Sequence, residues 1–577
     1  MTQKVLRNDW LTAIRLWLFS MKKNLGTAGL VTACVSLLCP GLFFVNWSYP
    51  VYETPTLYNA TDDAMIVMTI AAIFSCLLAL LLVCLNFSYL YKKSAGDLFH
   101  ALPLTRAKLL LARFAGCVLP ALLPALVNYA ALFMLSADRN IVLPVSFLLS
   151  GLALNVAVVL CVTAFSTIFL VLCGTTFSFL ASFAVFNLGI PAILFIGDHI
   201  AGLSLWGYTS DMLEVYYHCT PVLYAGTRYL TLYETTGWEL WMHIGILLLL
   251  TAVCLLVSCL LYNRRKSEKA GNAYAFRPVR YGIMGITCYV GSFVIGYLFD
   301  SQFLPLFWLF AAVGSLLIAL AFGAIMDKGF KTAVRSLIVG GVCFGLLFST
   351  FLGIGLDVVG YEDQLPALSQ IESVVYEDMF GSPMEFDDPA TIRSLHEFVI
   401  KRNPRDLLKA DPDEEKYNGW YSMDVTYKLK NGQTVSRSYN SHDLTVRKRL
   451  TAFLFSDEYR QSIDRLVESV GEGHLYVGYY IWNPEGAYED WFELTLTKAE
   501  YARFMDLYYS EGPAVDQNDD DYFTHQLGYY GKTGTSWSFH FPYSTKTCVK
   551  TTAYLHTLFE AQYPEKVQLF QKKQANA

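Results

Sequence analysis

A short string near the C-terminus has the residue types that end a nucleotide-binding loop. In Gly531-Lys532-Thr533, backbone amides and a lysine could hold the phosphates of a nucleotide, as they do in a P-loop. That pattern requires a glycine five positions before Gly531, and the residue there is Gln526. Because the first glycine is missing, we interpret the string as an ordinary turn.

A second string carries ligand types for a metal ion. Asp516, Asn518 and Asp520 have the spacing that begins a calcium-binding EF-hand loop, which continues with glycine and ends on glutamate at its twelfth position. Asp521 and Leu527 stand at those positions, so a solvated acidic loop is the better interpretation. The histidines of the C-terminal part are scattered and form no HExxH motif: His396, His442, His474, His525, His540 and His556. The sequence predicts no catalytic, cofactor-binding or metal-binding residue.

An aromatic cluster precedes these strings. Its side chains could stack on a sugar or a peptide, but packing in a β-rich core accounts for them better. The members are Tyr476, Tyr479, Tyr480, Trp482, Tyr488 and Trp491.

The composition divides the chain into two parts. Of the 577 residues, 54% are hydrophobic and 16% are charged, whereas a soluble protein carries about 25% charged residues. The segment Asp357–Ala577 has 35 acidic against 22 basic residues, and the remainder is slightly basic. Because the basic residues are few and spread over loops, nucleic acid is excluded as a partner. Of the 13 cysteines, only Cys219 and Cys548 are expected in water, which excludes a disulfide framework.

Nine apolar runs are each long enough to cross a bilayer, which requires about 20 residues. They are Leu25–Val45, Ala64–Leu90, Leu109–Leu135, Leu143–Leu172, Thr176–Ile196, Leu240–Leu261, Tyr281–Leu298, Leu304–Ile325 and Ser336–Leu356. Before the first run, Asp9–Met21 mixes apolar residues with Arg15. This segment suits either a helix lying on the membrane surface or an ordinary helix entering the membrane.

Lysine and arginine in the loops predict the orientation of these spans. The N-terminal segment, Tyr91–Lys108, Asn263–Arg280 and Asp327–Arg335 are basic and are expected in the cytoplasm, whereas the intervening loops are poor in basic residues. Nine spans then place everything after Asp357 outside the cell. The protein is expected in the cell membrane, with a cytoplasmic N-terminus and an extracellular C-terminal domain.

The C-terminal part changes to alternating apolar residues and short amphipathic helices. We expect a strand at Ile371–Glu377, a helix at Asp388–Lys401 and a hairpin through Asn431-Gly432, the strongest short turn signal. A helix over Val446–Val470 follows. The order then recurs, with strands near Leu475–Ile481, Trp491–Leu496 and Trp537–Phe541 and helices at Lys498–Tyr509 and Thr551–Tyr563. An α+β domain follows from this pattern, and the recurrence raises the question of a duplication.

The spans lack the carboxylates with which transporters bind coupling ions. Arg113 lies near the inner end of the third span, where its side chain is expected to reach the membrane surface. Asn128, Asn155 and Asn187 are expected to form hydrogen bonds between helices. The chain also has no ATPase motif, so any transport would be powered by another protein that contacts a cytoplasmic loop.

The loop Tyr91–Lys108 is the best candidate for that contact. Ser94 and Gly96-Asp97 can begin a short helix, and Leu102-Pro103 ends it, because a residue before proline avoids helical geometry. Thr105 is expected to cap the next helix. An exposed Phe99 would then suit insertion into a groove of a partner. The alternative is an ordinary amphipathic connection, since single exposed apolar residues are normal.

The region Met1–Arg280 resembles the ABC-2 type permeases, the membrane subunits of bacterial ABC exporters. The matching features are the amphipathic N-terminal helix, the loop DLFHALPLTRAKLLLAR (Asp97–Arg113), a core of six spans, the long segment Gly197–Glu239 and the basic stretch RRKSEKAGNAYAF (Arg264–Phe276). The resemblance implies that Gly197–Glu239 folds back as short helices. It also implies that the loop between the second and third spans is the coupling helix, which docks on the ATPase. That role falls on Asp97, Leu98, Phe99, His100, Leu102, Pro103 and Arg106.

The expected protein is an α-helical polytopic membrane protein with a C-terminal extracellular α+β domain. Its domains would be a permease core over 1–280, three additional spans over 281–356 and the extracellular domain over 357–577. The resemblance implies a transport subunit without enzymatic activity and without a cofactor, whose partners are ABC ATPase subunits, a second permease copy or a related permease, and the lipid bilayer. The alternative is a membrane-anchored sensor whose extracellular domain binds a ligand or a cell-envelope component without transport.

Overall fold

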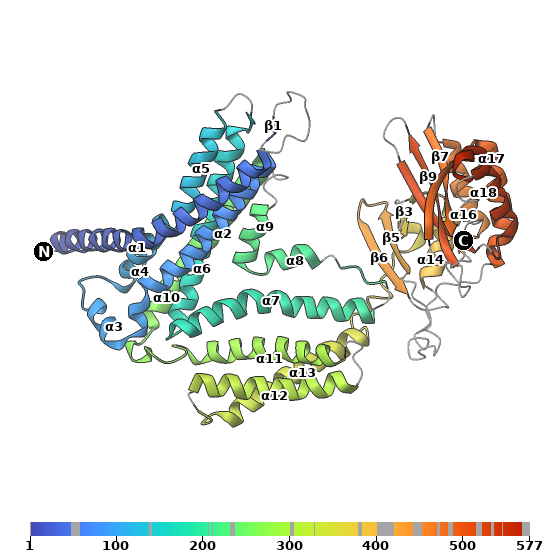
Figure 1. Ribbon diagram of the computed structural model, residues 1–577. Coiled ribbons are helices and arrows are strands. Elements are labelled where there is room, and N and C mark those ends of the chain that lie inside the picture. Colours follow the sequence, from blue (N-terminus) through green and yellow to red (C-terminus); the bar gives the residue numbers. More distant parts are fainter. Residues whose placement is uncertain are drawn as a thin grey trace, which may run out of the picture. The chain divides into compact units, whose positions relative to one another are not determined.

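The chain folds into two compact units. One unit comprises Met1–Ile200 and Asp211–Leu352, and the other comprises Ala201–Ser210 and Gly353–Ala577 (Figure 1). The computed structural model describes residues 2–47, 58–59, 61–137, 141–205, 207–210, 212–230, 237–300, 305–327, 329–378, 384–400, 421–441, 453–469, 473–482, 488–514, 522–531, 536–544 and 546–567. Asp516, Asn518 and Asp520, as well as Lys532 and Thr533, lie outside these ranges.

The first unit is built from long apolar helices. They are α1 (Thr2–Trp47), α2 (Thr61–Asn86), α4 (Arg106–Ala121), α5 (Leu123–Leu135), α6 (Val145–Leu172), α7 (Thr176–Ser204), α10 (Trp238–Arg264), α11 (Arg277–Phe299), α12 (Pro305–Asp327) and α13 (Ala333–Gly355). With α4 and α5 counted together, eight of these helices within the described residues are long and apolar enough to cross a membrane. They coincide with the second to ninth predicted spans, which supports a multi-pass membrane protein.

The N-terminal segment agrees with the second of its two interpretations, in which it continues into the first predicted span. Asp9–Met21 and the first predicted span, Leu25–Val45, belong to one continuous helix, α1. No separate surface helix precedes the span within the described residues, because the boundary between them, Lys22-Lys23-Asn24, contains no helix breaker. Asn24 is buried and its amide donates to the Gly116 carbonyl of α4 at 2.9 Å, which ties α1 to α4 across that boundary.

Short elements connect the long helices. They are η1 (Ser88–Tyr91), α3 (Lys93–His100), α8 (Met212–His218), α9 (Pro221–Leu230), η2 (Ser267–Lys269) and the parallel pair β1 (Tyr58–Asn59) and β2 (Ile141–Val142). The helices α8 and α9 lie in the segment Gly197–Glu239, where short helices were expected. Helix α7 extends to Ser204, eight residues beyond its predicted end at Ile196.

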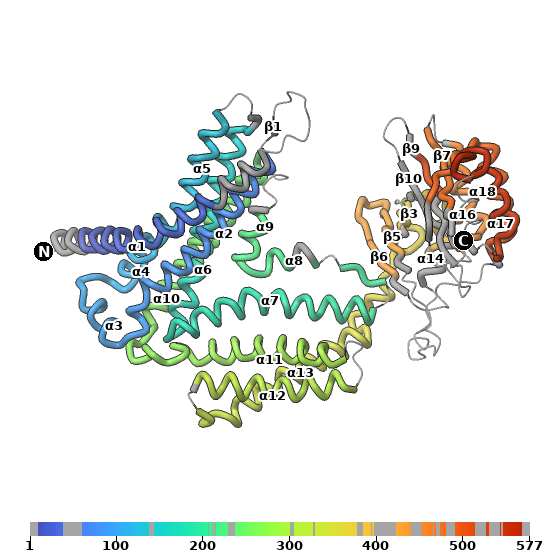
Figure 2. Tube along the Cα trace, viewed as in Figure 1, coloured from blue at the N-terminus to red at the C-terminus, as the bar shows by residue number. Residues whose placement is uncertain are grey.

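Helix packing buries polar as well as apolar side chains. Figure 2 traces α6 and α10, which pack together through hydrogen-bonded Thr167 and Ser258, with 2.9 Å between their hydroxyl oxygens. Asn128 donates to Ser36 of α1 at 3.4 Å and to the Pro124 carbonyl of its own helix at 2.7 Å, so one of the three predicted interhelical asparagine bonds is confirmed.

The other two asparagines behave differently. Asn187 donates to the Phe183 carbonyl of its own helix, α7, so this hydrogen bond does not join two helices. The Asn155 amide is buried without a hydrogen-bond partner among the described residues.

The second unit contains the sheets. Its elements are β3 (Ile371–Asp378), β4 (Met384–Phe386), α14 (Pro389–Ile400), β5 (Tyr421–Leu429), β6 (Thr434–Ser441) and α16 (Asp457–Ser469), followed by β7 (Gly473–Trp482), β8 (Tyr488–Thr495), α17 (Lys498–Glu511), η6 (Gly512–Ala514), β9 (Tyr522–Gly531), β10 (Ser536–Ser544) and α18 (Val549–Gln562). A further turn, η3 (Leu368–Gln370), precedes β3. The hairpin at Asn431-Gly432 is confirmed, and Gly432 adopts a φ of +81° there.

The two halves of this unit share one arrangement. Each described half runs strand, strand, helix, strand, strand, helix, and the antiparallel sheets have the orders β4-β3-β5-β6 and β8-β7-β9-β10. Both sheets and their helices contribute to a common core that includes Tyr427, Phe504 and Phe559. Tyr476 of the aromatic cluster is buried in its own sheet, and Tyr479 packs against the common core, as the packing interpretation predicted.

Arg437 of β6 joins two chain segments to the first sheet. Its guanidinium donates to the Tyr361 hydroxyl at 2.8 Å and to the Gln364 carbonyl at 2.7 Å. The Tyr361 hydroxyl donates in turn to the Gly207 carbonyl at 3.4 Å, and Thr209 donates to the Ser436 carbonyl at 3.4 Å. The segment that follows α7 is thereby bound to the same sheet as the segment that follows α13.

Further sequence predictions need correction. Of the helix predicted over Val446–Val470, residues 446–452 and 470 lie outside the described residues; Phe453 and Leu454 are helical, a turn at 455–456 interrupts the helix, and α16 covers Asp457–Ser469. Strand β9 was not predicted at all. Cys548 is buried at the start of α18 rather than exposed to water, and Cys219 is half-buried; both are free thiols.

Candidate functional site

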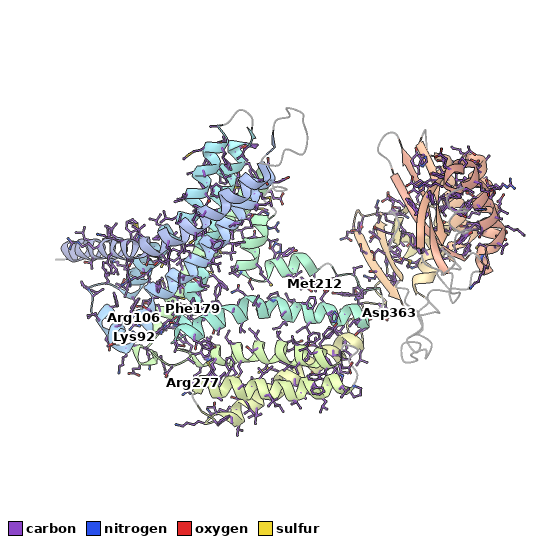
Figure 3. The ribbon with its side chains drawn as sticks, in the orientation of Figure 1. Lys92, Arg106, Phe179, Met212, Arg277 and Asp363 are labelled. Carbon is purple, nitrogen blue, oxygen red and sulfur yellow. The ribbon has the colours of Figure 1, made fainter. Side chains whose placement is uncertain are left out.

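The loop Tyr91–Lys108 forms one short helix between two turns. Helix α3 begins at Lys93 and ends at His100, before the predicted stop at Leu102-Pro103 (Figure 3). Its N-cap is Lys92, and no side chain caps this end, so the predicted start at Ser94 or Asp97 is wrong. Thr105 caps α4 as predicted, because its hydroxyl accepts from the Lys108 amide at 3.3 Å.

The side chains of the predicted docking residues divide between solvent and interior. Asp97, Leu98 and Pro103 are exposed, with Leu98 at 70% of its full surface. Phe99, His100, Leu102 and Arg106 are half-buried. Successive helical residues point about 100° apart, so Leu98 and Phe99 cannot share one direction.

Phe99 is not the exposed residue that the sequence predicted. Its ring lies 4.5 Å from the ring of Tyr89, centroid to centroid, and the Arg113 guanidinium stands 4.6 Å from its centroid. A cation over an aromatic face is attractive, and more so where water is excluded. Phe99 therefore anchors α3 to the membrane unit, while Leu98 is the apolar side chain that faces outward.

Arg113 does not reach the membrane surface either. It is 3% exposed, donates to the Ser20 hydroxyl of α1 at 3.1 Å, and stacks over Phe99 and Tyr89. The prediction that it reaches the surface is wrong because the aromatic pair and Ser20 offer the charge a site inside the protein. Arg113 thus connects α1, α3 and α4.

Tyr262, at the end of α10, binds both sides of the loop. Its hydroxyl lies 2.9 Å from Nε2 of His100 and 3.1 Å from the Tyr89 hydroxyl. Arg106 donates to the carbonyl of Tyr262 at 3.2 Å and to that of Arg265 at 2.6 Å. The two ends of the segment from α3 to α4 are therefore held by the same turn of α10.

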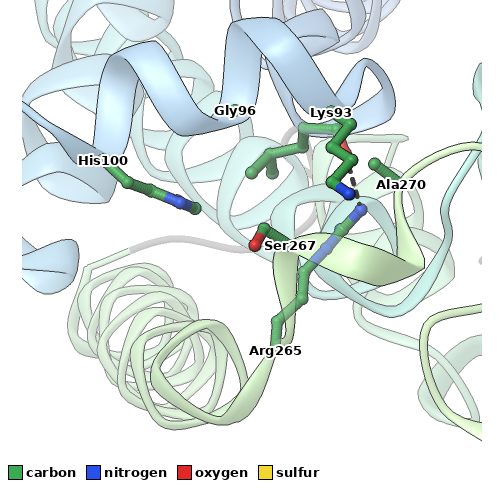
Figure 4. Close-up of a pocket in the computed structure, with 7 residues that line it drawn as sticks. Lys93, Gly96, His100, Arg265, Ser267 and Ala270 are labelled. Atoms are coloured by element: carbon green, nitrogen blue, oxygen red, sulfur yellow. Dashed lines mark hydrogen bonds between the residues drawn. The ribbon is translucent and has the colours of Figure 1, made fainter.

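Arg265 lies at the centre of this arrangement. It is 4% exposed and donates to the carbonyls of Leu90, Leu170 and Val171 at 2.9, 3.1 and 2.9 Å. The bond to Leu90 is the dashed line at Arg265 in Figure 4. The last carbonyls of a helix have no partner within it and carry partial negative charge. Burial lowers the pKa of the Arg265 guanidinium, and these carbonyls from η1 and α6 provide the polar contacts that keep the cation in place.

The segment 263–277 also runs against the turn between α6 and α7. The Gly174 amide donates to the Ala273 carbonyl at 3.0 Å, and the Gly174 carbonyl accepts from the Gly271 amide at 3.0 Å. A Cβ atom on Gly174 would lie 2.1 Å from the Asn272 carbonyl oxygen. The loops 172–175 and 263–277 are thus joined by main-chain hydrogen bonds, and the side chains of Arg106 and Arg265 join 263–277 to the loop 88–108. We refer to the three loops together as the loop assembly.

The cavity within the loop assembly is too small for a cofactor. It has a volume of about 10 Å³ and is lined by Leu90, Lys93, Gly96, His100, Arg265, Ser267 and Ala270 (Figure 4). That space suits about one water molecule. Across the described residues, no group of three His, Cys, Asp or Glu side chains could hold a metal ion.

The sequence did not single out Tyr262, Arg265 or Gly174. Arg265 entered only as one of several basic residues that orient the spans and as part of the basic stretch Arg264–Phe276. One signal was available, because Arg264 and Arg265 stand just beyond a long apolar run. That Arg265 turns inward depends on contacts with η1 and α6, which lie far away in the sequence.

We expect mild acid to loosen the loop assembly through His100. Burial, followed by the nearby Arg106 charge, lowers the pKa of His100, so the folded protein favours the neutral ring. The unfolded chain takes up a proton near the ordinary value of about 6.5. Acidification through that value therefore favours unfolding. When the pH is lowered from about 7.5 to about 5.5, the thermal midpoint should drop less in His100→Gln than in the wild type. An equal drop in both proteins would contradict this role.

No family model, no curated protein and no solved structure matches this chain, so its function is argued from the geometry described above.

Proposed function

We propose that this chain is the membrane subunit of an ABC exporter, powered by separate ATPase subunits that dock on the loop Tyr91–Lys108. The observation that carries the proposal is the pairing of an exposed Leu98 with a rigidly held helix α3. Leu98 is 70% exposed, whereas its neighbour Phe99 is held between Tyr89 and Arg113. An apolar side chain on an immobilised helix suits a groove of a partner protein.

The loop assembly supports this proposal because it connects α3 to several long helices. Phe99 contacts Arg113 of α4, His100 contacts Tyr262 of α10, and Arg265 binds carbonyls of η1 and α6. A push on Leu98 would act on these helices together, since packed interiors yield little to compression. The proposal also includes a core of six spans, a second permease copy and an extracellular position for the second unit.

The test uses substitutions that separate docking from folding. The genes beside that of this chain are first examined for an ATP-binding cassette protein; the full chain is co-expressed with such a protein, and co-purification and ATPase activity are measured. Leu98→Asp should abolish both while leaving the thermal midpoint of the permease unchanged, because the side chain points into solvent. Leu98→Met, which stays apolar and similar in size, should retain both.

Phe99→Asp is a poorer probe, because it removes the ring on which Arg113 stacks and so disturbs the permease itself. Normal assembly and coupled ATP hydrolysis in Leu98→Asp would refute docking at α3. If no ATP-binding protein associates with the wild type, the sensor alternative takes the place of the transport proposal.

A further inference from the structure

A groove runs along the first half of α10, between this helix, α9 and the end of α8. It has a volume of about 410 Å³ and is lined by His218, Pro221, Tyr224, His243, Ile246 and Leu250. All of these residues belong to the first unit. Ligand sites are concave and mostly apolar, with a few convergent polar groups, and this groove has both features.

The polar end of the groove contains a buried histidine. His243 is 6% exposed, and its Nδ1 lies 2.8 Å from the Tyr224 hydroxyl. Its Nε2 has no hydrogen-bond partner among the described residues, and the nearest carboxylate oxygen, on Glu239, is 3.8 Å away. The roles in this hydrogen bond depend on the tautomer of His243; in the tautomer in which the Tyr224 hydroxyl donates to Nδ1, Nε2 carries the proton. Nε2 is then a donor that lacks an acceptor.

A cation stands beside this histidine. The Arg228 guanidinium donates to Nε2 of His218 at 3.0 Å and lies 5.6 Å from the centroid of the Tyr224 ring. Because Nε2 of His218 accepts this bond, the proton of the neutral His218 ring is on Nδ1. His218 and His243 thus line the polar end of the groove, and Arg228 stands beside them through its contacts with His218 and Tyr224.

The opposite end is apolar. Ile246 and Leu250 follow His243 by three and seven residues along α10, so Leu250 lies about 10 Å further along the axis. Glu239 and His243 are in the first two turns of this membrane-spanning helix, whereas Leu250 is near its middle. The groove therefore changes from polar to apolar in the direction that leads from the end of the span toward the bilayer centre.

We infer that this groove binds an amphiphile whose headgroup carries an anionic phosphate or carboxylate. The headgroup oxygens would accept from His243 and interact with Arg228, and the chain would lie on Ile246 and Leu250. A wholly apolar occupant would leave Nε2 of His243 without an acceptor. A cationic headgroup would oppose Arg228, whereas the Glu239 carboxylate is exposed, so that solvent and salt screen its opposition to an anion. The inference requires a membrane-spanning α10 but does not depend on an ATPase partner.

Binding is measured by native mass spectrometry on the full chain in non-ionic detergent. The probes are dioctanoyl phosphatidylglycerol, dioctanoyl phosphatidylcholine, decanoate and inorganic phosphate. Phosphatidylglycerol should bind at least about tenfold more tightly than phosphatidylcholine, because charge-assisted hydrogen bonds are the stronger ones. Decanoate tests whether a carboxylate suffices, and inorganic phosphate tests whether the headgroup binds without a chain.

Four variants assign the contacts. Arg228→Gln and His243→Gln should each weaken phosphatidylglycerol binding about tenfold. Leu250→Gln should weaken binding of both lipids by a similar factor, since it disturbs the chain end of the groove. Arg277→Gln removes an exposed arginine elsewhere in the unit and serves as the matched control. A variant is included only if its thermal midpoint equals that of the wild type. If His243→Gln is unstable by this criterion, His243→Phe replaces it.

Equal binding of the two lipids, or unchanged affinity in both Arg228→Gln and His243→Gln, would overturn the inference. Inorganic phosphate binding as tightly as phosphatidylglycerol would also overturn it, because the apolar end would then contribute nothing. Selective binding of decanoate over phosphatidylglycerol would support the site and identify a carboxylate as its headgroup. None of these readouts changes if docking at Leu98 fails, so the two proposals can fail separately.

Discussion

Replacing Arg265 with glutamine should cost the membrane unit on the order of 3–5 kcal/mol of unfolding free energy. The guanidinium of Arg265 satisfies three buried carbonyls, those of Leu90, Leu170 and Val171. Each carbonyl left without a donor costs about 1–3 kcal/mol. Glutamine is shorter, carries one amide group, and cannot reach η1 and α6 together. We expect a lower thermal midpoint and faster tryptic cleavage after Lys92 and Lys93, which lie in the same loop.

Arg264→Gln is the matched control for this experiment. Arg264 precedes Arg265 directly but is exposed. Exposed charges contribute little to stability, so this variant should behave like the wild type. Similar midpoints for the Arg264 and Arg265 variants would mean that the three carbonyl contacts do not stabilise the loop assembly.

Gly174→Ala should have the second-largest effect. An alanine Cβ at this position would stand 2.1 Å from the Asn272 carbonyl oxygen and 2.7 Å from that of Lys269, and both atoms belong to the backbone. A flexible side chain could move aside, but here the segment 269–273 itself must shift. Overpacking of this kind costs about 1–3 kcal/mol. The shift would also break the paired hydrogen bonds of Gly174 with Gly271 and Ala273.

Hydrogen exchange on the full chain measures this change. The amides of Gly174 and Gly271 should exchange faster in Gly174→Ala than in the wild type. Gly282→Ala is the control, because a Cβ at that position meets nothing within 4 Å and alanine favours the helix α11. If the amides of Gly174 and Gly271 exchange as slowly in Gly174→Ala as in the wild type, their hydrogen bonds do not require the close approach of the two segments.

Local patterns were sufficient to predict most of the secondary structure. Apolar runs predicted the long helices, and Asn431-Gly432 predicted the hairpin between β5 and β6. Strand β9 escaped prediction because it follows the aspartate-rich run Asp519-Asp520-Asp521, which suggests a loop. The sequence left a surface helix and a helix entering the membrane as alternatives for Asp9–Met21, because its mixture of apolar residues with Arg15 suits both; the structure has one continuous helix.

The candidate site shows where local patterns fail. The sequence located helix α3 and the cap at Thr105, but not the rotation of α3 that turns Phe99 inward and Leu98 outward. That rotation depends on Tyr89 and Arg113, which meet Phe99 only after α2 and α4 have packed. Arg265 depends on partners 94 to 175 residues away along the chain, and such pairings leave no periodic signal.

The position of Arg265 in the chain has a consequence for biosynthesis. Leu90, Leu170 and Val171 are all translated before Arg265, so a nascent chain that ends within α10 holds these carbonyls without their donor. Until α10 is complete, the segment around α3 lacks the hydrogen bond that Arg265 donates to the Leu90 carbonyl. Under the function proposed above, the ATPase partner should bind the finished chain and not its unfinished precursors, so that completion of α10 would be a checkpoint for assembly.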